Sequence, residues 1–279
     1  MTARQMFLKP VAMATMCLAA AAAQASDVTV TLTQLAPAGG VGIAPLWVGF
    51  HNSSFDAFDL GSAASLGIER AAEDGSAAQL STIFAATVSG GVQGTLPGPP
   101  AFPGAVRSLT LSNVDLMGVD RYFSYAAMVV VSNDFFIGND NATEHDLSSI
   151  AKGGKISFLV GGPGDVYDAG TEVNDFNFSL ANSAFGLGGG QTAANQGTDE
   201  HGVVHVVTGN PYLSFLGQSL VPTGYDWTAL NFNDAPAFAR IDIEVAAVPE
   251  PATCALMLAG LASVGWIGRR STRKADAVA

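Results

Sequence analysis

The sequence has few cysteines and few basic residues, and each shortage excludes a class of function. Both cysteines, Cys17 and Cys254, lie in the end segments of the 279-residue chain, so the middle has no disulfide, thiolate metal site or cysteine nucleophile. The chain has 12 Lys and Arg against 24 Asp and Glu, and half of the basic residues also lie in the end segments. The acidic middle therefore lacks the basic stripe needed to bind nucleic acid or to dock on an anionic membrane.

Several catalytic motifs are also missing. The chain has no G-x-S-x-G elbow, no P-loop, no dinucleotide fingerprint and no HExxH zinc motif. We therefore assign no catalytic residues and expect a protein that is not an enzyme. Charged residues make up 13% of the chain and hydrophobic ones 48%, which excludes disorder and favours one well-packed core.

The first 25 residues have the pattern of a secretory signal peptide. Arg4 and Lys9 give a positive start, a short apolar run covers 10–20, and Ala23-Gln24-Ala25 fits the small-x-small cleavage pattern. We expect residues 1–25 to be removed and the mature chain to begin near Ser26. An N-terminal membrane anchor is the alternative, and the shortness of the apolar run disfavours it.

The C-terminal segment 248–279 has the pattern of a membrane tail. Residues 252–268 form a stretch of 17 residues without a charge, and this length is at the lower limit for a helix that spans a bilayer. A basic cluster begins at Arg269. The order of Val248-Pro249-Glu250-Pro251, an apolar helix and an arginine pair closely resembles the PEP-CTERM sorting signal. The resemblance implies a Gram-negative bacterium with an exopolysaccharide matrix. It also implies an exosortase that cuts near Pro-Glu-Pro after transient anchoring in the inner membrane. A simple anchor helix is the alternative.

The middle, residues 26–247, predicts an all-β domain. Short apolar or alternating runs rich in Val, Ile, Phe and Thr recur between turn signals, at 28–35, 46–50, 108–112, 122–131, 155–160, 203–207 and 237–245. The pattern favours an antiparallel β-sandwich with long Gly-rich loops at 90–103 and 186–197. Helical signal is weak: only 63–79 is a candidate, and Gly67 and Gly75 interrupt it, so we expect one or two short turns.

Four acidic residues follow strands or turns and are candidate metal ligands. They are Asp115, Asp134, Asp168 and Glu172. Gly170 allows a tight turn that brings Asp168 and Glu172 to one point, and Ca²⁺ prefers several carboxylate and carbonyl oxygens on loops. The spacing alone leaves the alternative open, because Asp and Asn are also common turn residues.

Three stretches resemble the spondin N-domain family of F-spondin and mindin. They are 47–52 with the following 68–75, then 128–138, and finally Tyr167-Asp168-Ala169-Gly170-Thr171-Glu172. The resemblance implies a calcium-binding antiparallel β-sandwich with an adhesion role. It transfers the calcium ligands to Asp115, Asp134, Asp168 and Glu172. The sequence departs from the family at 131–135, in having Glu172 in place of Asp, and in lacking the animal domain's disulfide.

The sequence as a whole predicts an exported, surface-sorted calcium-binding module. Its expected ligand is matrix polysaccharide or another surface protein. Two alternatives remain: an extracellular hydrolase using an acid pair from 165–175, and a purely structural matrix protein. A zinc pair at His201 and His205 has little support, because no third histidine lies at ligand spacing.

Overall fold

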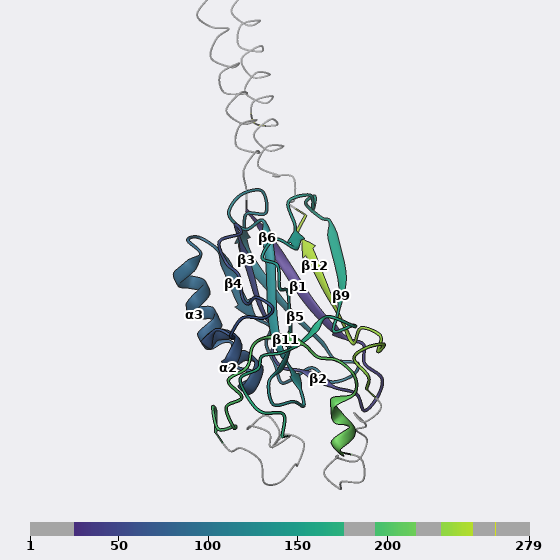
Figure 1. The fold of residues 1–279 in the computed structure, drawn as a ribbon. Coiled ribbons are helices and arrows are strands. Elements are labelled where there is room, and N and C mark those ends of the chain that lie inside the picture. The colour runs from purple at the N-terminus through teal and green to yellow at the C-terminus, as the bar shows by residue number, and fades with distance from the viewer. Residues whose placement is uncertain (1–24, 176–192, 216–229, 248–259, 261–279) are drawn as a thin grey trace, which may run out of the picture. The chain divides into compact units, whose positions relative to one another are not determined.

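The computed structural model describes residues 25–175, 193–215, 230–247 and residue 260 (Figure 1). Residues 25–246 form one compact unit. Apart from residues 25 and 260, the predicted signal peptide and C-terminal tail lie outside the described residues. Within the described ranges, no helix has the length and apolar character needed to cross a bilayer.

The smaller sheet has four antiparallel strands in the order β5-β1-β12-β9. The alternation in its sequence arises because one face is buried and the other is not. Val28, Val30 and Leu32 in β1 are at most 1% exposed, and the threonines between them face outward and bond across to β5, as in Thr31 Oγ1 to Ser108 Oγ at 2.9 Å. The strands are β1 (Ser26–Gln34), β5 (Val106–Val114), β9 (Lys155–Val160) and β12 (Ala239–Val245).

The larger sheet follows the order β11-β10-β7-β6-β3-β4, with β2 and β8 also paired to β6. Its central strands do not alternate: every residue of β3 and β7 is buried. This follows because both faces of the sheet are covered. The strands are β2 (Gly42–Ile43), β3 (Trp47–His51), β4 (Val92–Thr95), β6 (Tyr122–Val130), β7 (Phe135–Gly138), β8 (His145–Asp146), β10 (Val166–Asp168) and β11 (His205–Val206).

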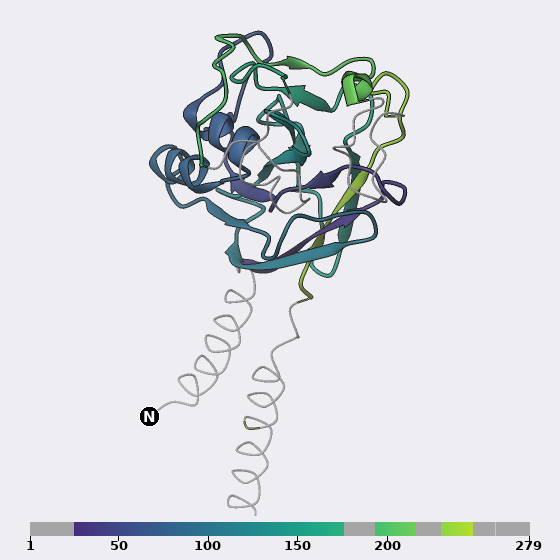
Figure 2. The ribbon, with the colours of Figure 1, turned by 90° about the horizontal axis from the view of Figure 1, so that it is seen from below.

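Two short helices cover the outer face of the larger sheet. They are α2 (Leu66–Asp74) and α3 (Ala78–Thr87). Ser65 caps α2 by accepting from the Ile68 N–H, and Gly75 ends it in the left-handed conformation at φ 64°. Ile68 and Phe84 pack on Trp47, which lies on the face of the sheet that the helices cover. The ring centroids of Trp47 and Phe84 are 5.4 Å apart. Figure 2 shows the helices on one side of the unit and β12 on the other.

A single hydrophobic core fills the space between the two sheets. It joins residues of the smaller sheet, such as Val30 and Ile241, to residues of the larger one, such as Phe50 and Val129. All four are fully buried. A short 3₁₀ helix, η3 (Pro211–Phe215), closes one side, where the buried Tyr212 hydroxyl donates to the Val131 carbonyl at 2.6 Å.

The structure confirms a mostly β protein with antiparallel sheets, and it corrects two details. The segment predicted to form one or two turns forms two helices, and the second continues to Thr87. Gly75 interrupts the segment as predicted, because it ends the first helix, whereas Gly67 lies inside that helix and packs against Leu80. The predicted loop 90–103 contains β4, where Gly94 lets β4 approach Leu109 of the smaller sheet.

Candidate functional site

Strand register brings Asp134 and Asp168 together. Asp134 occupies the turn between β6 and β7, one residue before Phe135. Asp168 ends β10 and pairs directly with Phe135 of β7 on one side and with His205 of β11 on the other. The two carboxylates are therefore neighbours across adjacent strands although 34 positions separate them in the sequence.

Asp134 has no exposed surface, and only half of its carboxylate is hydrogen-bonded. Its Oδ2 accepts from the Thr171 N–H at 2.9 Å, the Thr171 hydroxyl at 3.3 Å and the Glu172 N–H at 3.1 Å. Its Oδ1 is buried with no hydrogen-bond partner among the described residues. Burial, and secondarily the nearby charge of Asp168, raise the pKa of Asp134 to about 8. A buried carboxylate of this kind requires a proton or a cation at neutral pH.

Asp168 is 3% exposed, and local groups orient its carboxylate. Oδ1 accepts from the Gly170 N–H at 2.8 Å, and Oδ2 accepts from Asn174 Nδ2 at 2.7 Å. The side-chain oxygen of Asn174, Oδ1, is itself buried without a hydrogen-bond partner in the described part of the chain. An amide oxygen is a suitable ligand for a hard cation, so Asn174 adds a neutral donor beside the two carboxylates.

The third acidic residue of the cluster is Glu200, which the sequence had not indicated. Oxygen atoms of Asp134, Asp168 and Glu200 all lie within 4.8 Å of one another. Glu200 comes from the segment before β11, where its N–H donates to the Thr171 carbonyl at 3.1 Å. Its side chain is exposed, whereas the other two are buried. The cluster therefore has a buried floor, formed by the carboxylates of Asp134 and Asp168, and one acidic group, Glu200, on the side exposed to solvent.

The structure places the other two predicted ligands elsewhere. The Glu172 backbone contacts Asp134, but its side chain is directed to Gly197, where an added Cβ would lie 1.5 Å from Glu172 Oε1. Asp115 is exposed in the turn after β5, and its N–H donates to Asp120, just before the start of β6. Asp134 follows the other end of β6, and a nine-residue strand is roughly 26 Å long. Asp115 is therefore not part of this cluster.

The two histidines considered as a zinc pair do not share a strand face. His205 lies in β11, with Nε2 3.7 Å from Asp168 Oδ2. His201 precedes that strand in the left-handed conformation at φ 56°, and its exposed ring lies 2.9 Å from Asp199. Across the described ranges, the acidic cluster is the one group of three or more candidate metal ligands that converges.

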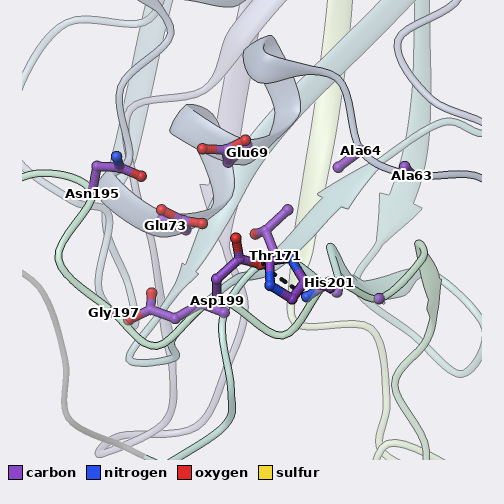
Figure 3. Close-up of a pocket in the computed structure, with 12 residues that line it drawn as sticks. Ala63, Ala64, Glu69, Glu73, Thr171, Asn195, Gly197, Asp199 and His201 are labelled. Carbon is purple, nitrogen blue, oxygen red and sulfur yellow. Dashed lines mark hydrogen bonds and ion pairs between the residues drawn. The ribbon is translucent and has the colours of Figure 1, made fainter.

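A pocket of about 180 Å³ lies on the other side of the 170–172 segment (Figure 3). Glu69 and Glu73 of α2 lie on one side of it, and Asp199 and His201 on the other. Arg70 of α2 forms ion pairs with Glu69, Glu73 and Asp74, and its guanidinium also donates to Asn195 at 2.8 Å. This pairing connects α2 to the segment that carries Glu200.

Gly170 makes the turn that supports the cluster, and replacing it is expected to destabilise the domain. Its φ is +66°, and an added Cβ would lie 2.6 Å from backbone atoms of Val203. We expect Gly170→Ala to lower the unfolding free energy by about 2–4 kcal/mol in urea titrations. Gly209→Ala is the matched control, because Gly209 has φ +68° but nothing within 4 Å, so it should lose only about 1 kcal/mol. Equal losses in both variants would show that the contact with Val203 has no role.

Comparison with known proteins identifies the C-terminal segment. Residues 247–274 match the family model described as the PEP-CTERM protein-sorting motif. A search of curated proteins finds no match to the chain. The resemblance of the middle to the spondin N-domain family therefore remains a prediction that rests on its three sequence stretches. The chain carries a PEP-CTERM motif, which indicates an exported, cell-surface-directed protein whose C-terminus is processed by an exosortase.

Proposed function

We propose that the exported β domain binds one calcium ion at Asp134, Asp168 and Glu200. The observation that carries this proposal is the Asp134 carboxylate, which is fully buried and has one oxygen without a hydrogen-bond partner among the described residues. Two further carboxylates lie beside it, with oxygens within 4.8 Å. Without a cation, ionised Asp134 and Asp168 repel each other where they are buried, and Glu200 adds a third negative charge on the exposed side.

The size of the cluster suits calcium. Calcium binds oxygen at 2.3–2.6 Å, so two ligands on opposite sides of the ion lie about 4.8 Å apart. Magnesium binds oxygen at about 2.1 Å in a nearly ideal octahedron and gives up its water reluctantly, so several protein carboxylates are a less usual ligand set for it. Asn174 offers a further buried oxygen, and water on the open side next to Glu200 would supply the remaining ligands.

The ion would fix three separate segments relative to one another. They are the β6–β7 turn, the end of β10 and the segment before β11. We propose that this rigid end serves an adhesion or matrix-binding role, with matrix polysaccharide or a surface protein as its ligand. This role rests on the resemblance to the spondin N-domain family, on the exported character of the chain and on a pre-organised surface costing less entropy when it binds. We also propose that the tail anchors the precursor in the inner membrane of a Gram-negative bacterium before processing.

Calcium titration by calorimetry on residues 26–247 tests the site. We expect one-site binding in the wild type and a loss of at least about 100-fold in affinity in Asp134→Asn and Asp168→Asn, because each substitution removes a charged ligand. Asp115→Asn is the matched control and should bind like the wild type, since Asp115 lies at the other end of β6. Glu200→Gln should weaken binding more than Glu172→Gln does. No heat in the wild type, or a loss caused by Asp115→Asn, would contradict the proposal.

A hydrolase that uses acids of the same loops is the competing function. Retaining glycosidases hold their two carboxyl groups about 5–5.5 Å apart, and inverting ones hold them farther apart. The Asp134 and Asp168 oxygens lie within 4.8 Å and both side chains are almost fully buried, which favours a bound ion over an acid–base pair. Release of reducing sugar from exopolysaccharide by the wild type, lost in Asp168→Asn, would favour the hydrolase instead.

A further inference from the structure

The chain enters and leaves the β domain at the same end. Ser26, the first residue of β1, pairs with Val114 at the end of β5. At the other terminus of the domain, Val245 pairs with Val28, and the Ala246 N–H donates to the Asp27 carbonyl at 2.8 Å. The PEP-CTERM match begins at the next residue, 247. The sorting tail therefore continues directly from this end of the domain.

The turn that follows Val114 presents apolar side chains at this end. We call residues 116–119 the apolar tip. Met117 is 80% exposed, the largest exposed fraction among the large apolar side chains of the described residues, and Val119 is 41% exposed. Leu116 is 7% exposed and packs in the core, which attaches the tip to the domain. Exposed apolar residues on a single turn have no packing role within the domain.

The tip is held rigidly. The buried Asp120 carboxylate accepts from the N–H of Asp115 at 2.8 Å and from the N–H of Val92 at 3.2 Å. The N–H groups of Gly118 and Asp120 both donate to the Asp115 carbonyl. These hydrogen bonds hold the turn that carries Met117 and Val119 in one conformation. The turn therefore loses little conformational entropy when these side chains contact a partner.

The length of the connection places the tip near the bilayer. The uncharged stretch of the tail begins at residue 252, so only residues 247–251 separate it from Ala246. The six residue steps from Ala246 to residue 252 span at most about 22 Å when fully extended. While the tail is embedded, the end of the domain that carries the tip therefore stays within this distance of the hydrocarbon region.

We propose that the apolar tip inserts into the lipid interface while the sorting tail is still attached. The proposal rests on the membrane anchoring included in the proposed function, and it is independent of the calcium site. The charges at this end are mixed. Asp27, Asp115 and Glu244 are exposed, Lys152 and Lys155 are exposed beside Val245, and Arg121 is paired with Asp146. A surface of this kind has no strong attraction to anionic lipid. Met117 and Val119 would enter the interface, and the contact would end when the tail is cut and the domain is released.

Site-directed fluorescence on the chain from Ser26 to its end tests this inference. Met117→Cys carries an environment-sensitive NBD label in a Cys254→Ser background, and the protein is reconstituted in vesicles of phosphatidylcholine and phosphatidylethanolamine without any other protein. Leu159→Cys is the matched control: Leu159 is 59% exposed but pairs with Arg240 at the far end of β12. Vesicle flotation reports separately whether the tail is embedded.

We expect the chain to float, with blue-shifted emission and quenching by spin-labelled lipid at position 117 and neither effect at position 159. If the chain floats but the label at position 117 gives the same emission spectrum as it does in residues 26–247 alone, the tip insertion is wrong and the anchoring stands. A chain that does not float would overturn the anchoring and the tip insertion together.

Discussion

Replacing Asp134 with asparagine should stabilise the calcium-free domain at pH 8 and remove its response to calcium. Asparagine keeps an oxygen for the N–H groups of Thr171 and Glu172, and its amide can donate to the neighbouring carboxylates. The wild-type carboxylate must instead hold a proton or remain charged in a buried site. Removing that charge eliminates the repulsion with Asp168, and it also eliminates an ion ligand.

The expected stability change depends on pH in a defined direction. Because the folded-state pKa of Asp134 is raised to about 8 from an ordinary value of 3.8, the folded domain holds this proton more tightly than the unfolded chain does. The corresponding stability is fully present below about pH 4 and is lost as the pH rises toward 8. In chelator, the wild type should therefore lose on the order of 5 kcal/mol relative to Asp134→Asn between pH 4 and pH 8.

Urea unfolding at pH 5 and pH 8, with chelator and with excess calcium, measures this effect. Asp115→Asn serves as the control and should follow the wild type in all four conditions. We expect calcium to reverse the order at pH 8, so that the wild type becomes the more stable protein. A wild type that remains as stable as Asp134→Asn in chelator at pH 8 would refute the buried, unpaired carboxylate as the basis of the site.

Calcium should also raise the melting temperature strongly. At a free concentration of 1,000 times Kd, binding to the folded state adds about 4 kcal/mol. For a domain of this size, each kcal/mol corresponds to about 2–4 °C, so the expected increase is about 8–16 °C in differential scanning calorimetry. The increase should be much smaller in Glu200→Gln, which loses the exposed ligand while keeping the buried floor.

Two comparisons make this melting experiment specific. Magnesium at the same concentration should raise the melting temperature less than calcium, because magnesium gives up its water reluctantly and needs a nearly ideal octahedron. Glu172→Gln should retain most of the calcium effect, since its side chain is directed to Gly197. Equal stabilisation by both ions would indicate general screening of the acidic surface rather than a defined site.

Much of the β architecture could be predicted from local patterns. The alternation of Thr29, Thr31 and Thr33 with apolar neighbours identified β1, because one face of the smaller sheet is exposed to water. In β12, Ile241 and Ile243 are two positions apart within the predicted run 237–245, and both are fully buried. The larger sheet has no such alternation, so its strands could be recognised only as continuous apolar runs.

The helices and β4 were harder to predict, because tertiary packing determines them. Ala78–Thr87 has no side-chain N-cap, and it is stabilised by Leu80 and Phe84 packing on the larger sheet. Gly94 in β4 suggested a loop, but an added Cβ there would lie 2.6 Å from Leu109 Cδ2, so any side chain would force Leu109 to move. Neither contact leaves a local signal in the sequence.

The candidate site shows the same division. Asp134 was predicted because it follows an apolar strand and Asp168 because it precedes the turn at Gly170, and strand pairing brings the two together. Glu200 is 32 positions after Asp168 in a polar segment, and only the pairing with residues 170–173 brings it close. Glu172 was predicted from its place after Gly170. In the structure its N–H donates to Asp134, but its side chain is directed to Gly197. Asp115 had no surrounding motif that could reveal its distance from the others.

A crystal structure of residues 26–247 grown with calcium tests the central claim most directly. We expect one ion bonded to oxygens of Asp134, Asp168 and Glu200 at 2.3–2.6 Å, with its identity shown by anomalous scattering. Asp134 Oδ1, which has no hydrogen-bond partner among the described residues, would then be a ligand. An ion held by Asp115 or Glu172 instead, or an Asp134 carboxylate that faces only protein atoms in excess calcium, would contradict the account.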